Sequence, residues 1–165
     1  MNWLLNRRVG FLVLALACAG MMAFALYLQY YKYLNPCPLC MFQRVFVIGV
    51  GAVALLAALH GPGQRRYQIY GLLAAVLALA GLAIAVRHTL LQYFPPASLP
   101  TCGAGLFQML DTTPLGEVVV TVLKGSGECA VIDWTFLGFS LPGWSAVGFA
   151  GLLAGALALA CVRRR

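Results

Sequence analysis

Residues 9–28 read VGFLVLALACAGMMAFALYL, an apolar run without a charged side chain. A helix needs about 20 mostly apolar residues to cross the hydrocarbon core of a bilayer, and this run is long enough. Three similar runs cover residues 41–59, 69–86 and 143–162, and the one charge among them is Arg44. The pattern predicts four membrane-spanning helices, and an even number of spans places both chain ends on one side of the membrane.

The composition excludes an ordinary water-soluble domain. Of the 165 residues, 62% are hydrophobic and 9% are charged, whereas soluble domains carry about 25% charged residues. We therefore expect residues 1–165 to form one all-α membrane domain, a four-transmembrane-helix bundle. A short loop (29–40) and a long loop (89–142) should lie on the side opposite the termini. A cleavable signal peptide is the alternative interpretation of the first run, but the run is longer than a typical signal-peptide core.

The charged residues indicate how the chain is oriented. Seven arginines, with no acidic residue among them, fall on the side shared by the termini: Arg7, Arg8, Arg65, Arg66, Arg163, Arg164 and Arg165. The long loop carries one lysine and all four acidic residues, a net charge of −3. Positive residues concentrate in cytoplasmic segments, so both termini should be cytoplasmic and the two loops external. The net charge of +7 thus orients the chain, and no nucleic-acid partner is expected.

Six cysteines divide between the spans and the external loops. Cys18 and Cys161 lie inside the first and fourth runs, where cysteine usually acts as a small buried hydrophobe. The other four lie two in each external loop: Cys37, Cys40, Cys102 and Cys129. An even number of cysteines in an oxidising compartment implies disulfides. A static disulfide that staples the long loop is the simplest interpretation of the second pair.

The first pair forms the motif Cys37-Pro38-Leu39-Cys40. This spacing serves both metal binding and thiol–disulfide exchange, in which one cysteine becomes a reactive thiolate. A structural zinc site needs four close ligands. Cys102 and Cys129 are too widely spaced to form a second knuckle, and the external loops contain no histidine. Redox chemistry is therefore favoured, and no metal is expected. Met41 after the motif argues against covalent haem.

Two polar residues follow Cys40 on the same helical face. If a helix begins near Cys40, Gln43 and Arg44 stand at positions i+3 and i+4. A guanidinium one turn from a cysteine can stabilise its thiolate and donate to a carbonyl oxygen. The alternative is that Arg44 extends to the lipid headgroups. His88, at the end of the third run, is a second candidate contact for a polar ligand.

The remaining signals concern packing and the long loop. Gly151-x-x-x-Gly155 permits close helix approach in the fourth span. Thr113-Pro114 is typical of a helix start and Lys124-Gly125 of a helix end, which predicts a short amphipathic helix on the membrane surface. The β-branched run Val118–Val122 keeps a strand open as an alternative. Four aromatic residues then form an interfacial belt before the fourth span: Trp134, Phe136, Phe139 and Trp144.

Together these features resemble the DsbB family, the bacterial inner-membrane disulfide bond formation protein B. The resemblance covers nearly the whole chain. Besides the four spans and Cys37-x-x-Cys40 with Arg44, it rests on the following segments: Arg87-His88-Thr89-Leu90-Leu91-Gln92, Thr101-Cys102, Gly127-Glu128-Cys129-Ala130, Trp134-Thr135-Phe136-Leu137-Gly138 and Pro142-x-Trp144. Each segment is common alone, but their order and spacing together are specific.

The resemblance implies an enzyme of periplasmic disulfide bond formation, a thiol:quinone oxidoreductase. It would reoxidise a DsbA-like periplasmic thiol oxidase and pass electrons to the quinone pool, ubiquinone or menaquinone, as the family does. Its redox-active disulfides would be Cys37–Cys40 and Cys102–Cys129. The partner would attack Cys102, and the released Cys129 would attack Cys37.

The resemblance also assigns the cofactor-binding residues. Cys40 would become the thiolate that faces the quinone. Arg44 would hold a quinone oxygen, and His88 would be a second polar neighbour. Gln43 and Leu141 depart from the acidic residue and the methionine that some members carry, which concerns quinone affinity.

Two other functions compete with this one. The vitamin K epoxide reductase class also joins a C-x-x-C motif to a quinone in a helix bundle. In that class, however, the loop pair precedes the C-x-x-C, the reverse of the order here. A four-span membrane scaffold with purely structural disulfides is the non-enzymatic alternative.

Overall fold

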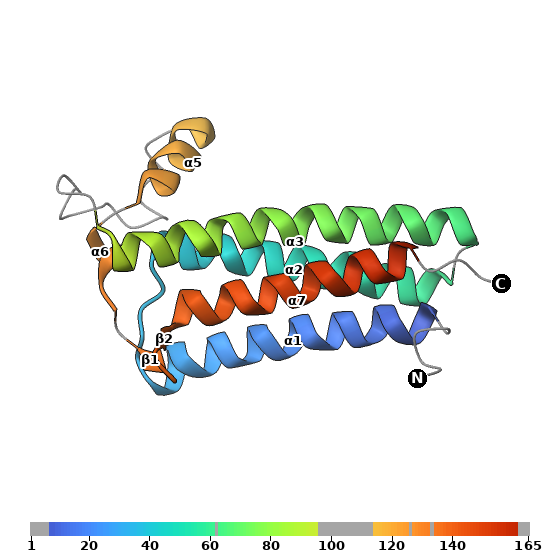
Figure 1. Cartoon of the computed structure of the whole chain (residues 1–165), viewed down its shortest axis with the longest axis horizontal. Coiled ribbons are helices and arrows are strands. Elements are labelled where there is room, and N and C mark those ends of the chain that lie inside the picture. The colour runs from blue at the N-terminus through green and yellow to red at the C-terminus, as the bar shows by residue number, and fades with distance from the viewer. Residues whose placement is uncertain (1–6, 62, 96–113, 126, 133, 162–165) are drawn as a thin grey trace.

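The computed structural model describes residues 7–61, 63–95, 114–125, 127–132 and 134–161. Four long helices lie side by side: α1 (Arg7–Tyr31), α2 (Pro38–His60), α3 (Gln64–Tyr93) and α7 (Leu141–Cys161). All four are long and apolar enough to cross a membrane. The start of α1 and the end of α7 lie at the same end of the bundle (Figure 1). The predicted all-α four-helix membrane bundle is confirmed.

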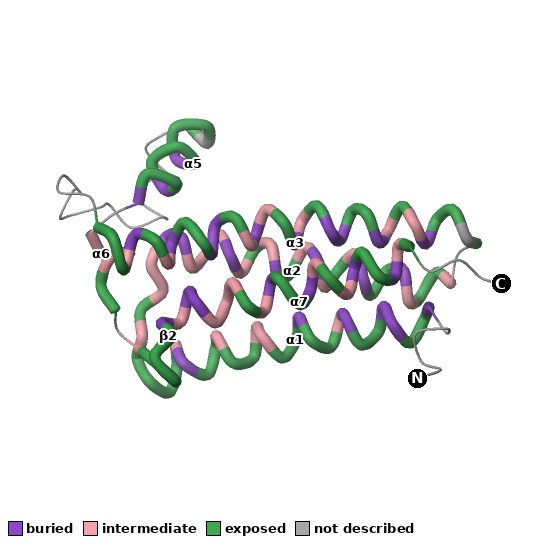
Figure 2. Tube along the Cα trace, viewed as in Figure 1, coloured by how far each residue is buried: buried purple, intermediate pink, exposed green. Residues whose placement is uncertain are grey.

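The bundle has a narrow core and a wide apolar exterior. Phe11, Val50, Ala78 and Phe149 are fully buried between the helices. The outer faces of the helices stay exposed along their whole length (Figure 2), and the exposed residues include large hydrophobic side chains. A soluble monomer rarely exposes apolar surface on this scale. Lipid is the solvent that suits this exterior, so the bundle is a multi-pass membrane domain.

Small residues bring α3 and α7 into close contact. A β-carbon added to Gly71 would lie 2.8 Å from the β-carbon of Ala160 and 3.0 Å from its backbone. Because helices in lipid associate through close van der Waals packing, a glycine here lets the two backbones approach. The predicted contribution of Gly151 is wrong, since this residue faces open space. Gly155 does pack, against Leu14 of α1.

All four helices begin before the apolar runs that predicted them, and α2 and α3 show why. α2 begins at Pro38 because proline suits the first turn of a helix, and Cys37 is its extended N-cap. α3 continues to Tyr93, so His88 lies inside the helix and not at its end. Charged residues end a hydrophobic run without ending the helical hydrogen bonding. The helix stops just before Pro95, as expected for a segment that precedes a proline.

The described part of the long loop folds against one end of the bundle. It contains α5 (Leu115–Lys124), α6 (Gly127–Ala130) and a small antiparallel hairpin of β1 (Thr135–Phe136) and β2 (Phe139–Ser140). The helix predicted in this loop is therefore present, and the strand alternative is wrong. α5, α6 and the hairpin lie at the bundle end opposite the start of α1 (Figure 1). Cys161 is exposed, unlike Cys18, so the expectation that both would be buried holds for Cys18 alone.

Candidate active site

The two cysteines of the C-x-x-C motif occupy the start of α2. Cys37 is the N-cap residue and Cys40 lies in the first helical turn. Both are partly buried, and neither forms a disulfide in this structure. Cysteines at a helix N-terminus are favoured as thiolates, because the unpaired backbone N–H groups and the helix dipole stabilise negative charge. The local sequence alone thus places both cysteines where a thiolate would be stabilised.

His88 of α3 approaches both cysteines. Its side chain is 2% exposed. Its Nε2 atom lies 3.6 Å from the Sγ of Cys37, and its Nδ1 atom lies 3.9 Å from the Sγ of Cys40. The side-chain amide of Gln43 lies 3.2 Å from Nδ1. With Gln43 donating to Nδ1, the ring proton belongs on Nε2, where it can be donated to Cys37.

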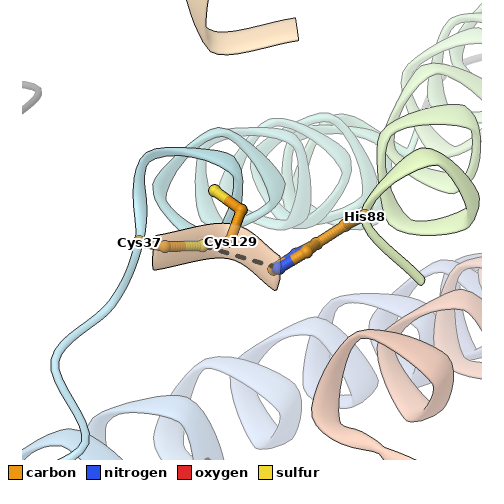
Figure 3. Close-up of side chains that lie close together, drawn as sticks. All are labelled: Cys37, His88 and Cys129. Atoms are coloured by element: carbon orange, nitrogen blue, oxygen red, sulfur yellow. Dashed lines mark hydrogen bonds between the residues drawn. The ribbon is translucent and has the colours of Figure 1, made fainter. Parts of the chain in front are cut away.

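Cys129 of α6 completes the cluster. Its side chain is 1% exposed. The ligand atoms of Cys37, His88 and Cys129 all lie within 4.8 Å of one another. Figure 3 shows the three side chains reaching this point from three separate elements. A cysteine of the long loop therefore lies within reach of the first cysteine of the C-x-x-C. Cys102, the other loop cysteine predicted from the sequence, falls outside the described residues.

Arg44 turns toward α1. Its guanidinium donates one hydrogen bond to the side-chain oxygen of Gln29 and another, of 3.3 Å, to the backbone carbonyl of Ala25. Hydrogen bonds from a charged donor are stronger than neutral ones, so this geometry limits where the guanidinium can move. The side chain thus has protein partners in place of the lipid headgroups considered as an alternative.

A cavity of about 200 Å³ joins these groups. Cys37, Cys40, Arg44 and His88 all line it. The remaining wall is mainly apolar, and α1, α7 and the segment before the hairpin contribute the following apolar residues to it: Met21, Phe24, Leu28, Val131, Trp134, Leu141, Trp144 and Phe149. An apolar cavity with a few convergent polar groups is the usual form of a small-molecule site.

The predicted aromatic residues cluster beside this cavity. The rings of Trp134 and Phe136 stack at 6.0 Å. Trp144 contacts both Phe136 and Phe139, and its indole N–H donates to the carbonyl of Phe136 at 2.9 Å. The hairpin holds these rings together at the start of α7. Trp134 and Trp144 form part of the cavity wall.

Comparisons with known proteins show the family of the chain. A family model described as disulfide bond formation protein DsbB matches residues 7–159. The chain belongs to the DsbB family. Disulfide bond formation protein B of Hahella chejuensis is 49% identical over 162 residues, which cover 98% of this chain and 97% of that protein. The protein of the same name from Chromobacterium violaceum is 48% identical over 161 residues, with the same coverage.

Family membership confirms the resemblance inferred from the sequence. This DsbB-family chain is a multi-pass membrane oxidoreductase of disulfide bond formation, and its family implies cysteine redox centres. In Acinetobacter baumannii, a disulfide bond formation protein B is 51% identical over 145 residues, 87% of this chain and 84% of that protein. The clustered cysteines suit the chemistry that these names describe.

Three polar residues of this DsbB-family chain acquire a role only in the folded structure. Gln29 holds Arg44, and Gln43 holds the ring of His88. Arg87 donates to the carbonyls of Leu123 and Lys124 at 3.3 and 3.4 Å, so it caps the last turn of α5. One signal was available for Gln29, because a lone polar residue at a span end is a functional candidate. The partner of Arg87 had no local signal.

Proposed function

We propose that this DsbB-family oxidoreductase takes an electron pair from a DsbA-like periplasmic thiol oxidase and passes it to ubiquinone or menaquinone in the bacterial inner membrane. One observation carries the proposal. The C-x-x-C cysteines, Arg44 and His88 line a single cavity between membrane-spanning helices, and Cys129 of the loop meets Cys37 beside it. Because the electron donor is soluble and the electron acceptor is lipid-soluble, the enzyme needs a path from a loop cysteine to a cavity between the spans.

The cavity suits a quinone headgroup. A protein cavity of about 150 Å³ with apolar walls is large enough to hold benzene, and this one measures about 200 Å³. Its aromatic and aliphatic walls suit a ring, the Arg44 guanidinium offers N–H donors for a carbonyl oxygen, and the His88 ring is a second polar neighbour. A bound quinone accepts two electrons and two protons. Arg44 and His88 are therefore the proposed cofactor-binding residues, with Gln29 and Gln43 as their supports.

The proposed relay begins with the oxidised pairs Cys102–Cys129 and Cys37–Cys40. The partner's thiolate attacks Cys102, forms a mixed disulfide and displaces Cys129 as a thiolate. Cys129 then attacks Cys37, which forms a Cys37–Cys129 bond and displaces Cys40 as a thiolate. The second thiol of the partner attacks the mixed disulfide, so the partner leaves oxidised and Cys102 leaves reduced. The electron pair then resides on Cys40 and Cys102, and exchange needs no metal or added oxidant up to this point.

The surrounding side chains support the second exchange. The sulfurs of Cys37 and Cys129 lie within 4.8 Å of each other, so they must approach by up to about 2.8 Å to reach disulfide bonding distance. The Nε2 proton of His88 faces Cys37 and can neutralise that sulfur when it leaves again as a thiolate. Arg44 follows Cys40 by one helical turn and favours its charged form. Apolar packing by Leu39 and Leu91 restricts water around the cluster.

The proposed orientation places both termini in the cytoplasm and the cysteine-bearing loops in the periplasm. In the sequence, seven arginines lie near the two termini and in the connection between α2 and α3, whereas the long loop is acidic. The positive-inside bias supports this arrangement. It puts Cys129 and α5 on the side where a soluble thiol oxidase is found.

Oxidation of a thioredoxin-like partner with added quinone tests the function. Cys37→Ser and Cys40→Ser variants should lose quinone-dependent turnover, whereas Cys18→Ala should keep it, because Cys18 lies in the helix core. Unchanged turnover in either motif variant would overturn the proposal.

A trapping experiment separates the enzyme from a scaffold with structural disulfides. A partner that lacks its second thiol can attack the Cys102–Cys129 disulfide and displace Cys129, but it cannot break the mixed disulfide that results, so the covalent complex through Cys102 should accumulate. Failure to trap this partner, with a chain that still inserts and folds, would favour the scaffold.

A further inference from the structure

Cys37, His88 and Cys129 form a cluster of metal-ligating side chains. They come from the N-cap of α2, from α3 and from α6, and they converge on one point (Figure 3). Each offers one ligand atom, and all three atoms lie within 4.8 Å of one another. Thiolate sulfur and imidazole nitrogen are the ligands that Zn²⁺ prefers. The spacing of the cysteines in the sequence argued against zinc. Folding, however, brings His88 and Cys129 to Cys37, which the spacing could not reveal.

The distance between two of the ligand atoms matches the distance expected between two ligands of a tetrahedral zinc site. Zinc binds sulfur at about 2.3 Å and nitrogen at about 2.0–2.1 Å, which puts the two ligand atoms about 3.6 Å apart. The Sγ of Cys37 and the Nε2 of His88 lie 3.6 Å apart. Two zinc-bound sulfurs lie about 3.8 Å apart by the same geometry. Cys129 therefore needs at most a small shift to act as the third ligand.

The surroundings support a bound cation. A histidine that binds a metal through one nitrogen usually hydrogen-bonds through the other. Here the side-chain amide of Gln43 lies 3.2 Å from Nδ1 of His88, and a half-turn of that amide presents its oxygen as the acceptor of an Nδ1–H. Leu39, Leu91 and Val118 pack around Cys129. Burial in an apolar shell slows the access of water and of competing ligands.

We propose that the reduced protein binds one Zn²⁺ or Cd²⁺ ion through the sulfurs of Cys37 and Cys129 and Nε2 of His88, with water in the fourth position. Two thiols lose their protons on binding, and no electrons move. The oxidised protein cannot form the site, because a disulfide removes the thiolate ligands. The site is therefore specific to the reduced state.

An ion in this position would inhibit the enzyme. It would hold the two sulfurs that exchange in the relay, Cys37 and Cys129, so electrons could not pass between the two cysteine pairs. This consequence rests on the proposed function, whereas the binding itself rests only on the geometry of the three residues. A chelator should restore turnover, since no bond other than coordination is made.

Titration of the reduced full-length protein in detergent tests the site. Zn²⁺ affinity is measured by competition with a chromophoric chelator, and Cd²⁺ binding by the absorption of cadmium–thiolate bonds. One ion per chain is expected. Cys37→Ser, Cys129→Ser and His88→Gln should each raise Kd by at least about tenfold, the lower end of what loss of an outer-shell partner alone costs. Circular dichroism shows whether each variant remains folded.

Matched variants elsewhere in the chain serve as controls. Cys161→Ala and His60→Ala remove a cysteine and a histidine at the far end of the bundle, and both should leave Kd unchanged. The proposal is overturned by equal binding to oxidised protein, or by an unchanged Kd in His88→Gln. Quinone-dependent turnover without added metal is measured in parallel, so failure of the metal site and failure of the proposed function give different results.

Discussion

Arg44 on α2 is held by Gln29 on α1, through a hydrogen bond from the guanidinium to the side-chain oxygen. The carbonyl of Ala25, one turn earlier on α1, accepts a second bond from the same guanidinium. This contact joins two helices at the wall of the cavity that contains Cys40. A cation fixed in this way need not be ordered again when an acceptor oxygen binds beside it, which lowers the entropic cost of binding.

Gln29→Ala should weaken the proposed quinone site and leave the cysteines intact. Hydrogen bonds to charged groups contribute about 1.5–3 kcal/mol, and Arg44 is only partly buried, so an effect near the lower end is expected. The KM for quinone should rise by about tenfold. Gln68→Ala, near the start of α3 and outside the cavity lining, is the matched control and should behave as wild type. An unchanged KM in Gln29→Ala would show that Arg44 needs no support from Gln29.

Gln43→Leu should slow turnover by disturbing His88. The substitution removes the amide 3.2 Å from Nδ1 and leaves a buried ring nitrogen without that partner, which costs about 1–3 kcal/mol. The rate of quinone reduction should fall by about fivefold or more, with little change in the affinity for the thiol partner. Gln43→Glu replaces the amide donor with an acceptor, which can contact Nδ1 only when that nitrogen carries a proton, so it should recover the rate only in part. Equal rates for all three proteins would remove Gln43 from the site.

Arg87→Ala should loosen α5 without unfolding the bundle. Arg87 donates to the last carbonyls of α5, and losing these exposed contacts costs about 0.5–1.5 kcal/mol for each bond. Hydrogen exchange of the α5 amides should accelerate by several-fold, because local opening follows local stability. Exchange in α2 should stay as in wild type. Arg66→Ala, in the first turn of α3, controls for loss of a positive charge, and it should not alter exchange in α5.

Gly71→Ala should destabilise the bundle, whereas Gly151→Ala should not. The added methyl at Gly71 would lie 2.8 Å from the β-carbon of Ala160, and such overpacking typically costs about 1–3 kcal/mol. Gly151 faces open space, so alanine there gains up to about 1 kcal/mol of helix propensity. Thermal unfolding in detergent compares the two variants. The same melting temperature for both would contradict the close contact between α3 and α7.

The sequence by itself determined the four helices and the placement of the C-x-x-C at the start of α2, and it favoured the amphipathic helix of the long loop over a strand. These features follow from local patterns, because apolar runs, proline at a helix start and helical periodicity each act over a few neighbouring residues. The charge distribution likewise supported one orientation. The sequence predicted the ends of the helices least well, as α3 shows, because helical hydrogen bonding continues where the hydrophobic run stops.

Only the tertiary structure decided which of these residues meet. His88 and Cys129 are far from Cys37 in the chain, and the packing of α3 and α6 against the start of α2 brings them together. In the same way, the packing of α1 against α2 gives Arg44 its partner Gln29. The sequence alone does not distinguish one glycine of a span from another, but packing puts Gly71 against a neighbouring backbone and Gly151 in open space. Such contacts depend on helix rotation and register, which residues distant in sequence set jointly.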